Sequence, residues 1–588
     1  MNKKIIIGIV ITLFLAIGLT YAWWTWNSTT NTDVSLTIDG ININYEAGSD
    51  ITNIKLLPVT SKEKGVEDNI AIKKDITVSS NTNVYMDLNM SLELFPDGLK
   101  HESLKWEIYK DNNLVNSGNL GSSNQGDVVK LLSSEKVTTV ESIYTLYIWI
   151  DGNVDNPDTM QNQNFKFVLN ANATDYMPLD TSGANAPKIV DNMIPVMYNG
   201  EAWVKADSTN TNSTYKWYDY TNKQWANAVL VSETNRDSYL SATPGTIVSE
   251  DDVLAYYVWI PRYKYKVFNI SKTIGTDSYD AKTTGIDIVF EEGTASTGEI
   301  KCNNYSFAAA SSSATNETCS GSNGGYYTHP AFTFGDTELE GIWVGKFEVS
   351  NSTSQIRTKP NVISLRSKSV SSFYSAIKSM QNSGNAYGLS TDTSKVDSHM
   401  LKNMEWGAVA YLTNSDYGRC ANGSCTEVTI NSNSSYTTGG GNYVSNVNQS
   451  TTGNIYGIYD MSGGAFEYVM GNMSSGSGSY TYYPRNAGGN FSYSSTTAKY
   501  IDTYAYGTSY SDQTAYNRAR LGDATGEVVS SSSYARYNDY AFFVSSSDPW
   551  FLRGGYYKDG SSAGVFYFDR GTGNAGSGVS ARAALLAL

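Results

Sequence analysis

Six short motifs in a fixed order along residues 253–588 constrain the fold of this chain more than any other feature. Three of them combine aromatic residues with glycine, so they offer large rings for a core and points where the backbone can turn sharply. One such motif restricts the fold weakly, whereas six in a defined order restrict it strongly. The motifs are YVWIP at 257–261, GIWVGKFEV at 341–349, MEWGAVAY at 404–411, GIYDMSGGAFEY at 457–468, RGG at 553–555 and SAR at 580–582.

The motif at 457–468 is the most specific of the six. Its isoleucine and methionine are expected in the core, while its aspartate and serine can hydrogen-bond to the backbone of a turn. Its glycine pair permits a positive φ, which side chains with a Cβ disfavour. These residues are Ile458, Met461, Asp460, Ser462, Gly463 and Gly464.

The order and chemistry of these motifs resemble the formylglycine-generating-enzyme family, also known as sulfatase-modifying factors. The resemblance covers residues 253–588 and implies an α+β domain with a C-type-lectin-like fold, in which 404–411 lies on a helix. That scaffold is known both as a catalyst and as a platform for binding loops. The fold alone therefore does not decide the function.

The region after the RGG motif argues against catalysis. The oxidase that the resemblance suggests uses a cysteine pair there as a copper thiolate site, because Cu(I) prefers soft sulfur ligands. Residues 556–571 contain neither Cys nor His, and the three histidines of the chain, His101, His329 and His399, are scattered. We find no nucleophile, zinc-protease or phosphate-loop motif. We expect no enzyme, and an oxidase or other enzyme on this fold stays open as the alternative.

The same C-terminal region favours ligand binding. Tyr, Ser, Asp and Asn side chains alternate there with apparent scaffold residues, as in binding loops that combine rigid aromatic contacts with adaptable hydrogen bonds. The pattern resembles the variable proteins of diversity-generating retroelements. We expect an adhesin-like or receptor-like surface for a protein or glycan ligand; a structural surface or phage virion protein is the second alternative. The candidate ligand-binding residues are Trp550, Tyr556, Tyr557, Lys558, Asp559, Ser561, Ser562, Tyr567, Asp569, Thr572, Asn574 and Ser577.

Charged residues within the motifs are expected to hold the scaffold together. Arg553 and Arg582 are predicted to form salt bridges, and Glu467 is predicted to bind an arginine. The resemblance leaves calcium near Glu467 as an alternative, although Gly464 stands where the family usually has Asn. We expect no other cofactor or metal.

The N-terminus reads as a targeting segment. Lys3 and Lys4 precede an apolar run over residues 5–19, and tryptophans follow it. Residues 1–26 are therefore expected to be a signal peptide or an uncleaved membrane anchor, and both place the rest outside the cytoplasm. A net charge of −15 disfavours nucleic acid as a partner.

Four cysteines suit an oxidising compartment. Local pairing of Cys302 with Cys319 and of Cys420 with Cys425 is favoured among three connectivities. Zinc is disfavoured by the spacing.

Composition and periodicity divide the rest of the chain into parts. Residues 27–175 are expected to form an all-β sandwich acting as a spacer, and 176–187 a linker. A small β module is expected over 188–250, whose tryptophans form its core or, alternatively, a sugar platform. The large domain covers 251–588. Within it, helical spacing is found at 371–381 and 398–412.

Overall fold

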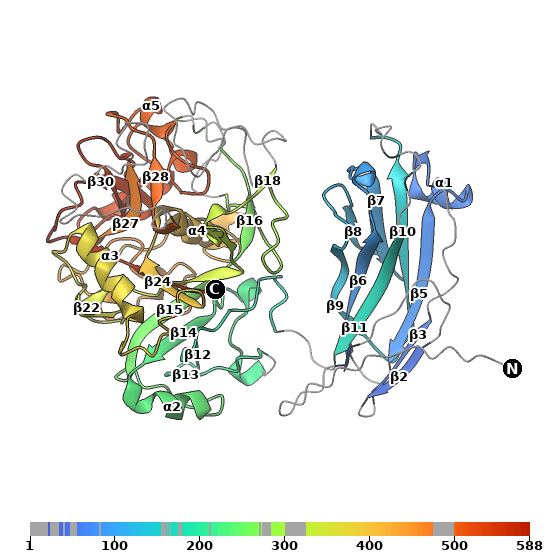
Figure 1. The fold of residues 1–588 in the computed structure, drawn as a ribbon, viewed down its shortest axis with the longest axis horizontal. Coiled ribbons are helices and arrows are strands. Elements are labelled where there is room, and N and C mark those ends of the chain that lie inside the picture. The colour runs from blue at the N-terminus through green and yellow to red at the C-terminus, as the bar shows by residue number, and fades with distance from the viewer. Residues whose placement is uncertain are drawn as a thin grey trace. The chain divides into compact units, whose positions relative to one another are not determined.

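The structure is a computed structural model of the chain. The described residues are mostly β-strand with few helices (Figure 1). They belong to two compact units, Met1–Pro178 and Leu179–Leu588, which are described separately. The structure describes residues 22–23, 34–38, 41–46, 56–80, 84–154, 160, 163, 166–174, 179–210, 213–269, 272, 274, 284–299, 325–473 and 499–588.

The N-terminal unit contains two sheets. One has the strand order β1-β11-β6-β9, and the other has the order β2-β3-β5-β10-β7-β8, with β4 paired in parallel to β10. A short helix, α1 (Lys62–Glu67), and a 3-10 turn, η1 (Asp97–Leu99), lie in its connections. The strands are β1 (Ala22–Trp23), β2 (Val34–Ile38), β3 (Ile41–Glu46), β4 (Pro58–Val59), β5 (Ile72–Ser80), β6 (Val84–Leu94), β7 (Leu104–Lys110), β8 (Asn113–Asn119), β9 (Val128–Val137), β10 (Ser142–Asp151) and β11 (Lys166–Thr174).

The two sheets of this unit enclose one core. Leu88 and Leu169 from one sheet and Leu146 from the other are fully buried in the same apolar cluster. Alternate residues of β5 are buried, because one face of its sheet packs inward while the other meets solvent. The arrangement is a β-sandwich.

A seven-stranded antiparallel sheet forms the centre of the C-terminal unit, in the order β13-β12-β14-β15-β21-β32-β24. All nine residues of β15 are buried, so both faces of the sheet are covered at that strand. The last strand of the chain, β32, lies inside the sheet between β21 and β24. The strands are β12 (Ile194–Tyr198), β13 (Trp203–Lys205), β14 (Asn227–Val231), β15 (Val253–Pro261), β21 (Gly341–Gly345), β24 (Val396–Met400) and β32 (Ala583–Ala587).

Residues 188–250 are part of this sheet, which corrects the expectation of a separate small module. Strand β14 pairs with β15 over five residue pairs, so the sheet continues across the expected boundary at residue 250. Trp203, Trp217 and Trp225 are buried in the core of the unit, so they cannot serve as a sugar platform. The tryptophan-rich segments of 188–250 predict an independent module, but strands β13, β12 and β14 of this region form one end of a larger sheet.

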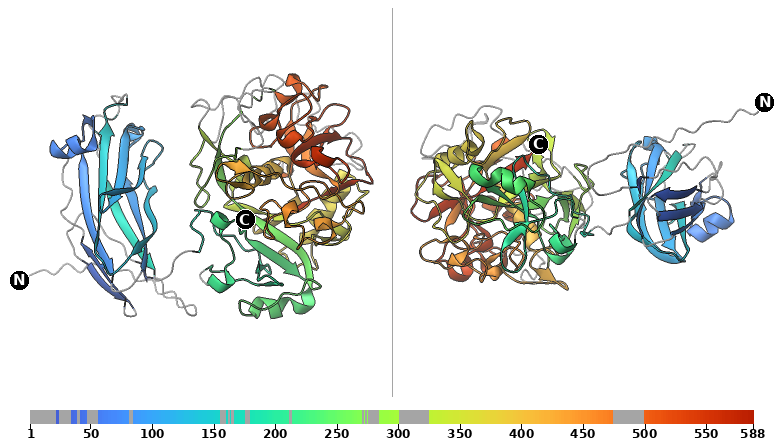
Figure 2. Two further views of the ribbon diagram at one scale, coloured as in Figure 1. Left: turned by 180° about the vertical axis from the view of Figure 1, so that it is seen from behind. Right: turned by 90° about the horizontal axis from the view of Figure 1, so that it is seen from below.

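A second sheet carries the C-terminal motifs, in the order β28-β27-β29-β30, with β31 paired in parallel to β27. Figure 2 shows these elements from two further sides. They are β27 (Phe466–Met473), β28 (Asp502–Tyr504), β29 (Trp550–Gly554), β30 (Gly564–Gly571) and β31 (Val579–Ala581). The remaining strands are short: β16 (Tyr263–Lys266), β17 (Ile288–Phe290), β18 (Tyr326–Thr328), β19 (Thr333–Phe334), β20 (Thr337–Glu338), β22 (Ser350–Ser352), β23 (Gln355–Arg357), β25 (Cys420–Ala421) and β26 (Ser424–Cys425).

Four α-helices are described in this unit: α2 (Glu233–Ser241), α3 (Val370–Lys378), α4 (Asn403–Thr413) and α5 (Gln513–Tyr516). Helix α3 agrees with the helical spacing at 371–381. The helix expected over 398–412 is partly wrong, because residues 398–400 belong to β24. Every residue of α4 is buried, and its Trp406 indole donates to the carbonyl oxygen of Val565 in β30, at 2.9 Å. Helix α4 therefore joins the two sheets.

Among the described residues, no helix is long and apolar enough to cross a membrane. The predicted targeting segment lies outside the described residues except for the short strand β1.

Candidate binding surface

The candidate ligand-binding residues lie on the hairpin of β29 and β30 and on the segment that follows it. Trp550 is fully buried and Tyr567 is 2% exposed, so neither can present its ring to a ligand. This corrects the prediction for both. Strand β30 is covered on both faces over much of its length, and Tyr567 therefore lies inside although it alternates with Phe566 and Phe568.

The other candidates reach the surface. Lys558, Ser561, Asn574 and Ser577 are exposed, and Tyr556, Tyr557, Asp559, Ser562, Asp569 and Thr572 are half-buried. The loop between the strands contains the 3-10 turn η12 (Gly560–Ser562).

Three half-buried tyrosines form the centre of this surface, and we call Tyr436, Tyr556 and Tyr557 the tyrosine cluster. The rings of Tyr436 and Tyr557 meet edge to face with centroids 4.8 Å apart, and those of Tyr556 and Tyr557 do so at 5.4 Å. Beneath them, Phe466 stacks on Tyr556 at 4.7 Å. Such pairs contribute about 0.5–1.5 kcal/mol beyond the area that they bury, so the rings hold one another in place.

Aromatic contacts continue from this cluster toward a second exposed ring. Phe466 lies 5.8 Å from Tyr567, and Tyr567 lies 6.3 Å from Tyr540, measured between ring centroids. Tyr540 in turn stacks against Tyr534, which is 37% exposed. The buried Tyr567 thus supports the surface from within.

Backbone hydrogen bonds attach the tyrosine cluster to the motif at 457–468. The amide of Tyr557 donates to the carbonyl oxygen of Gly464, and the amide of Gly463 donates to that of Gly554, both at 3.0 Å. Gly463 and Gly464 have φ of 76° and 75°, as the sequence predicts. A Cβ at Gly464 would lie 2.6 Å from Glu348 Oε1, so a side chain there has no room. The glycine pair therefore sets where the binding loop leaves the scaffold.

A buried ion pair lies behind this turn. Arg582 donates through Nε to Glu467 Oε2 at 3.0 Å and through Nη2 to Glu467 Oε1. It also donates to the carbonyl oxygens of Gly345 and Tyr459. The salt bridge predicted for Arg582, and the arginine partner predicted for Glu467, are thus present.

Two further buried carboxylates, Glu348 and Asp460, face this ion pair. Burial raises the pKa of Glu467 to about 7, against the attraction of Arg582. Burial, together with the charges of Asp460 and Glu467, also raises the pKa of Glu348 well above its usual range. Glu348 Oε2 and Asp460 Oδ2 make no hydrogen bond within the described part of the chain. The raised pKa values of Glu348 and Glu467 favour the protonated form of these carboxyl groups over the ionised one.

Arg553 differs from the prediction. Its guanidinium donates to the carbonyl oxygen of Ala524 at 3.1 Å and to Asn403 Oδ1 at 3.4 Å, and no carboxylate of the described residues pairs with it. The cation lies 5.5 Å from the ring centroid of Trp406. Arg553 thus binds the buried ends of neighbouring loops without forming a salt bridge.

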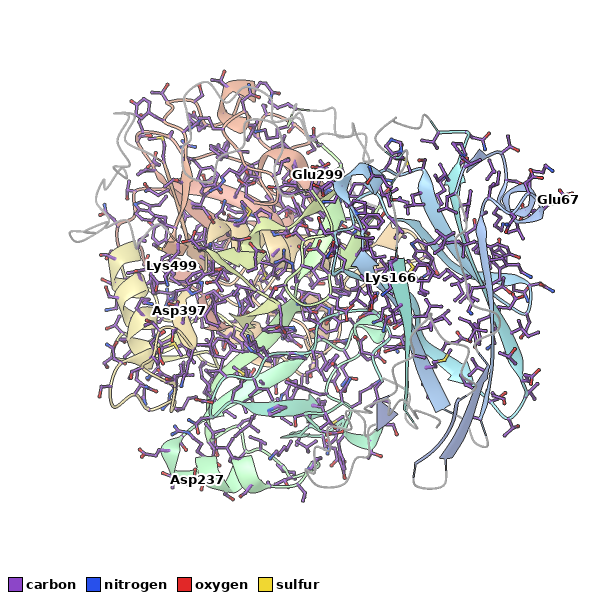
Figure 3. All side chains as sticks on the ribbon, turned by 45° about the vertical axis from the view of Figure 1, so that its right-hand side comes forward. Glu67, Lys166, Asp237, Glu299, Asp397 and Lys499 are labelled. Carbon is purple, nitrogen blue, oxygen red and sulfur yellow. A yellow bond between two sulfur atoms is a disulfide. The ribbon has the colours of Figure 1, made fainter. Side chains whose placement is uncertain are left out.

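His329 and His399 lie in the interior of the C-terminal unit. His329 is buried, receives a hydrogen bond from the amide of Ala331, and has a pKa lowered by burial to about 3. His399 bridges Asp397 (labelled in Figure 3) and Glu405, at 3.0 Å each. Although burial acts to lower it, these carboxylates raise the pKa of His399. Among the described residues, no group of three or more Cys, His, Asp or Glu side chains has the geometry of a metal site.

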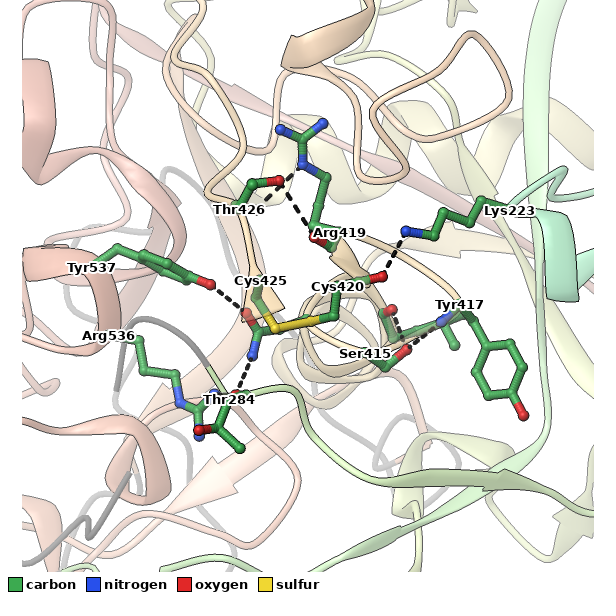
Figure 4. The surroundings of a disulfide bond; sticks show 12 residues. Lys223, Thr284, Ser415, Tyr417, Arg419, Cys420, Cys425, Thr426, Arg536 and Tyr537 are labelled. Carbon is green, nitrogen blue, oxygen red and sulfur yellow. Dashed lines mark hydrogen bonds between the residues drawn. A yellow bond between two sulfur atoms is a disulfide. The ribbon is translucent and has the colours of Figure 1, made fainter. Parts of the chain in front are cut away.

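A disulfide links Cys420 and Cys425 across the β25–β26 hairpin, which confirms that predicted pair (Figure 4). Lys223 donates through Nζ to the carbonyl oxygen of Cys420 at 2.6 Å, so the hairpin is tied to the connection between β13 and β14. Cys302 and Cys319 lie outside the described residues.

Sequence reasoning missed Tyr436 and Phe466 as members of the site. Tyr436 belongs to a Ser/Asn/Tyr-rich loop at 431–437 with the same composition as the C-terminal loop, which could have pointed to it. Its proximity to Tyr557, more than a hundred residues later in the chain, could not be seen in the sequence. Phe466 lies inside the motif at 457–468, for which the sequence predicts no surface role, and it is half-buried.

Comparisons with known proteins give little similarity. No protein-family model and no curated protein matches the chain. A solved structure with some similarity is the Drosophila melanogaster CENP-C cupin domain, which is 10% identical with a TM-score of 0.07. That match covers 25% of this chain and 75% of the other.

Proposed function

We propose that this chain is a non-catalytic recognition protein, displayed outside the cytoplasm, that binds its ligand through the tyrosine cluster. One observation carries the proposal: Tyr436, Tyr556 and Tyr557, from loops far apart in sequence, meet half-buried on a turn fixed by Gly464. Rigid aromatic side chains lose little conformational entropy on binding, so they suit an anchor. Exposed Ser and Asn side chains around them supply hydrogen bonds that set specificity.

We also propose that residues 253–588 adopt the formylglycine-generating-enzyme-like, C-type-lectin-like α+β fold. Three of the six motifs meet at one place: Gly463 bonds to Gly554, and Glu467 pairs with Arg582. A terminal surface varied by a retroelement would then change loop residues without touching these contacts. A reverse-transcriptase gene and a near-copy of the terminal coding segment beside this gene would test the diversification.

Binding selections on the purified full chain test the recognition function. We expect the chain to enrich ligands from a glycan array or a displayed peptide library. A variant carrying Tyr436→Ala, Tyr556→Ala and Tyr557→Ala is expected to lose those ligands while staying folded, with a melting temperature lowered only by the loss of the ring contacts. The matched control is Tyr506→Ala, which removes a ring that is 44% exposed outside the cluster.

Three results would contradict the proposal. One is the absence of any enriched ligand, and another is equal binding by the triple variant. The third is oxidation of a peptidyl thiol by the purified chain, detected by mass spectrometry. That result would establish the oxidase alternative instead.

A further inference from the structure

Two cations flank the tyrosine cluster. The guanidinium carbon of Arg366 lies 3.9 Å from the ring centroid of Tyr436, and Lys558 Nζ lies 5.4 Å from that of Tyr557. Neither cation forms an ion pair with a carboxylate of the described residues. Arg366 is half-buried and Lys558 is exposed, so both charges remain at the surface.

The groups around these cations are tyrosines rather than carboxylates. The pKa of Lys558 is raised by Tyr557, Tyr556 and Tyr436, and no carboxylate contributes. The nearest carboxylate in sequence, Asp559, accepts a 3.1 Å hydrogen bond from the backbone amide of Tyr556. Burial and the charge of Asp569 raise the pKa of Asp559. Arg366 and Lys558 thus bring two cations without ion-pair partners among the described residues to the tyrosine cluster of a chain with a net charge of −15.

The rings of the cluster add to this preference. One face of each is already covered: Tyr436 by Arg366, Tyr557 by Lys558 and Tyr556 by Phe466. Each ring therefore has less open face than a free tyrosine, and the edge of an aromatic ring carries partial positive charge. A sugar that stacks needs an open face, whereas a carboxylate is attracted to ring edges and to cations.

Arg366 has donors to spare for a carboxylate. Its Nη1 donates to the carbonyl oxygen of Ser577 and its Nε is buried, whereas its Nη2 makes no hydrogen bond within the described residues. A guanidinium held by one nitrogen and free at another can bind a carboxylate in a fixed orientation. Arg and Tyr are also the residue types that dominate protein–protein hot spots.

Resting on the proposed function, we infer that the tyrosine cluster binds an acidic segment of a partner protein, whose carboxylates Arg366 and Lys558 receive. The tyrosine rings pack against the segment between its acidic side chains. Because the charges lie at the surface, salt screens this part of the affinity.

Fluorescence anisotropy on the full chain tests the inference with labelled oligoglutamate, oligoglutamine and oligolysine peptides of equal length. Only oligoglutamate is expected to bind, more weakly at high salt. The double variant Arg366→Gln/Lys558→Gln is expected to lose about tenfold in affinity, equivalent to about 1.4 kcal/mol. The control Lys188→Gln removes an exposed lysine outside the cluster and should bind like the parent chain.

Equal binding of oligoglutamate and oligoglutamine would overturn the inference. So would tighter binding of oligogalacturonate, which would assign the surface to an acidic glycan. If the double variant keeps the library ligands that the triple tyrosine variant loses, the acidic partner is wrong and the recognition surface stands. If the triple tyrosine variant keeps them too, the proposed function itself fails.

Discussion

The backbone amide of Tyr557 donates a 3.0 Å hydrogen bond to the carbonyl oxygen of Gly464. This contact joins the most specific sequence motif to the loop that carries the tyrosine cluster. Gly464 lies directly above the carboxylate of Glu348, whose Oε1 accepts from the amide of Ala465 at 2.8 Å. A buried cluster of carboxyl groups and the loop proposed to bind a ligand therefore meet at one glycine turn.

Replacing Gly464 with Ala should destabilise the C-terminal unit by about 2–3 kcal/mol, because strain at a positive φ adds to a steric conflict with Glu348. Urea unfolding followed by tryptophan fluorescence measures the loss. Gly560→Ala is the control, since Gly560 has φ of 58° and nothing within 4 Å of the added Cβ. The control should lose only about 1 kcal/mol. Equal losses would show that the space above Glu348 is not restricted.

Replacing Glu348 with Gln should stabilise the unit at neutral pH by about 1 kcal/mol or more. In the folded state, burial raises the pKa of Glu348 well above its ordinary value of 4.5. In the unfolded chain, Glu348 loses its proton near pH 4.5. Stability from this group is thus complete below pH 4.5 and falls as pH rises. Gln cannot ionise, and its amide oxygen can still accept from Ala465.

The measurement is the unfolding free energy between pH 4.5 and 7, the window that the raised pKa of Glu467 also spans. The variant should show a flatter decline than the parent chain. A steeper decline, or lower stability than the parent at pH 7, would mean that Glu348 is ionised in the folded protein.

Glu405 provides the opposite case. Burial acts to raise the pKa of Glu405, but His399 lowers it. This carboxylate therefore stabilises the folded state at pH values above its ordinary pKa of 4.5. That stabilisation is lost as the pH falls. Glu405→Gln should cost about 3–5 kcal/mol at pH 7, because it removes one of the two carboxylates that the buried His399 bridges. Thermal unfolding at pH 7 checks the loss. A neutral or stabilising effect would indicate that His399 is uncharged.

Removing the disulfide should cost about 2 kcal/mol, the loop-closure contribution for a sequence separation of 5. The double variant Cys420→Ser/Cys425→Ser tests this pair alone, whereas a reductant would also act on Cys302 and Cys319. Denaturant unfolding of the variant and the parent gives the difference. A loss below about 0.5 kcal/mol would show that the contacts of Lys223 with this hairpin already hold it closed.

The sequence predicted those features that depend on local chemistry. Ile458 and Met461 are buried, and the glycine pair beside them has positive φ, because these roles follow from residue type within one turn. The segment at 398–400 was assigned to a helix because its apolar residues also fit helical spacing, whereas a partner strand far away in the chain, β32, makes it a strand. Long-range pairing of this kind leaves no local signal.

The binding surface shows the same limit at single residues. Tyr567 follows a strand pattern in which one face is expected to be exposed, but Phe466 and Tyr540 cover that face. Tyr436 reaches the site only through the fold. Composition thus pointed to this loop but could not separate the buried Tyr567 from the rings that reach the surface.

Alanine substitution separates the two kinds of ring. Tyr567→Ala should destabilise the C-terminal unit by about 3–5 kcal/mol, because it leaves a cavity in place of a buried aromatic side chain. Tyr557→Ala should cost less than about 1 kcal/mol, since its half-buried ring contacts mainly other surface rings. Chemical denaturation of both variants provides the comparison, and near-ultraviolet circular dichroism reports whether the packing of the neighbouring aromatic rings is kept. If Tyr567→Ala is tolerated as well as Tyr557→Ala, the ring of Tyr567 lies at the surface, and it then belongs with the residues that meet the ligand.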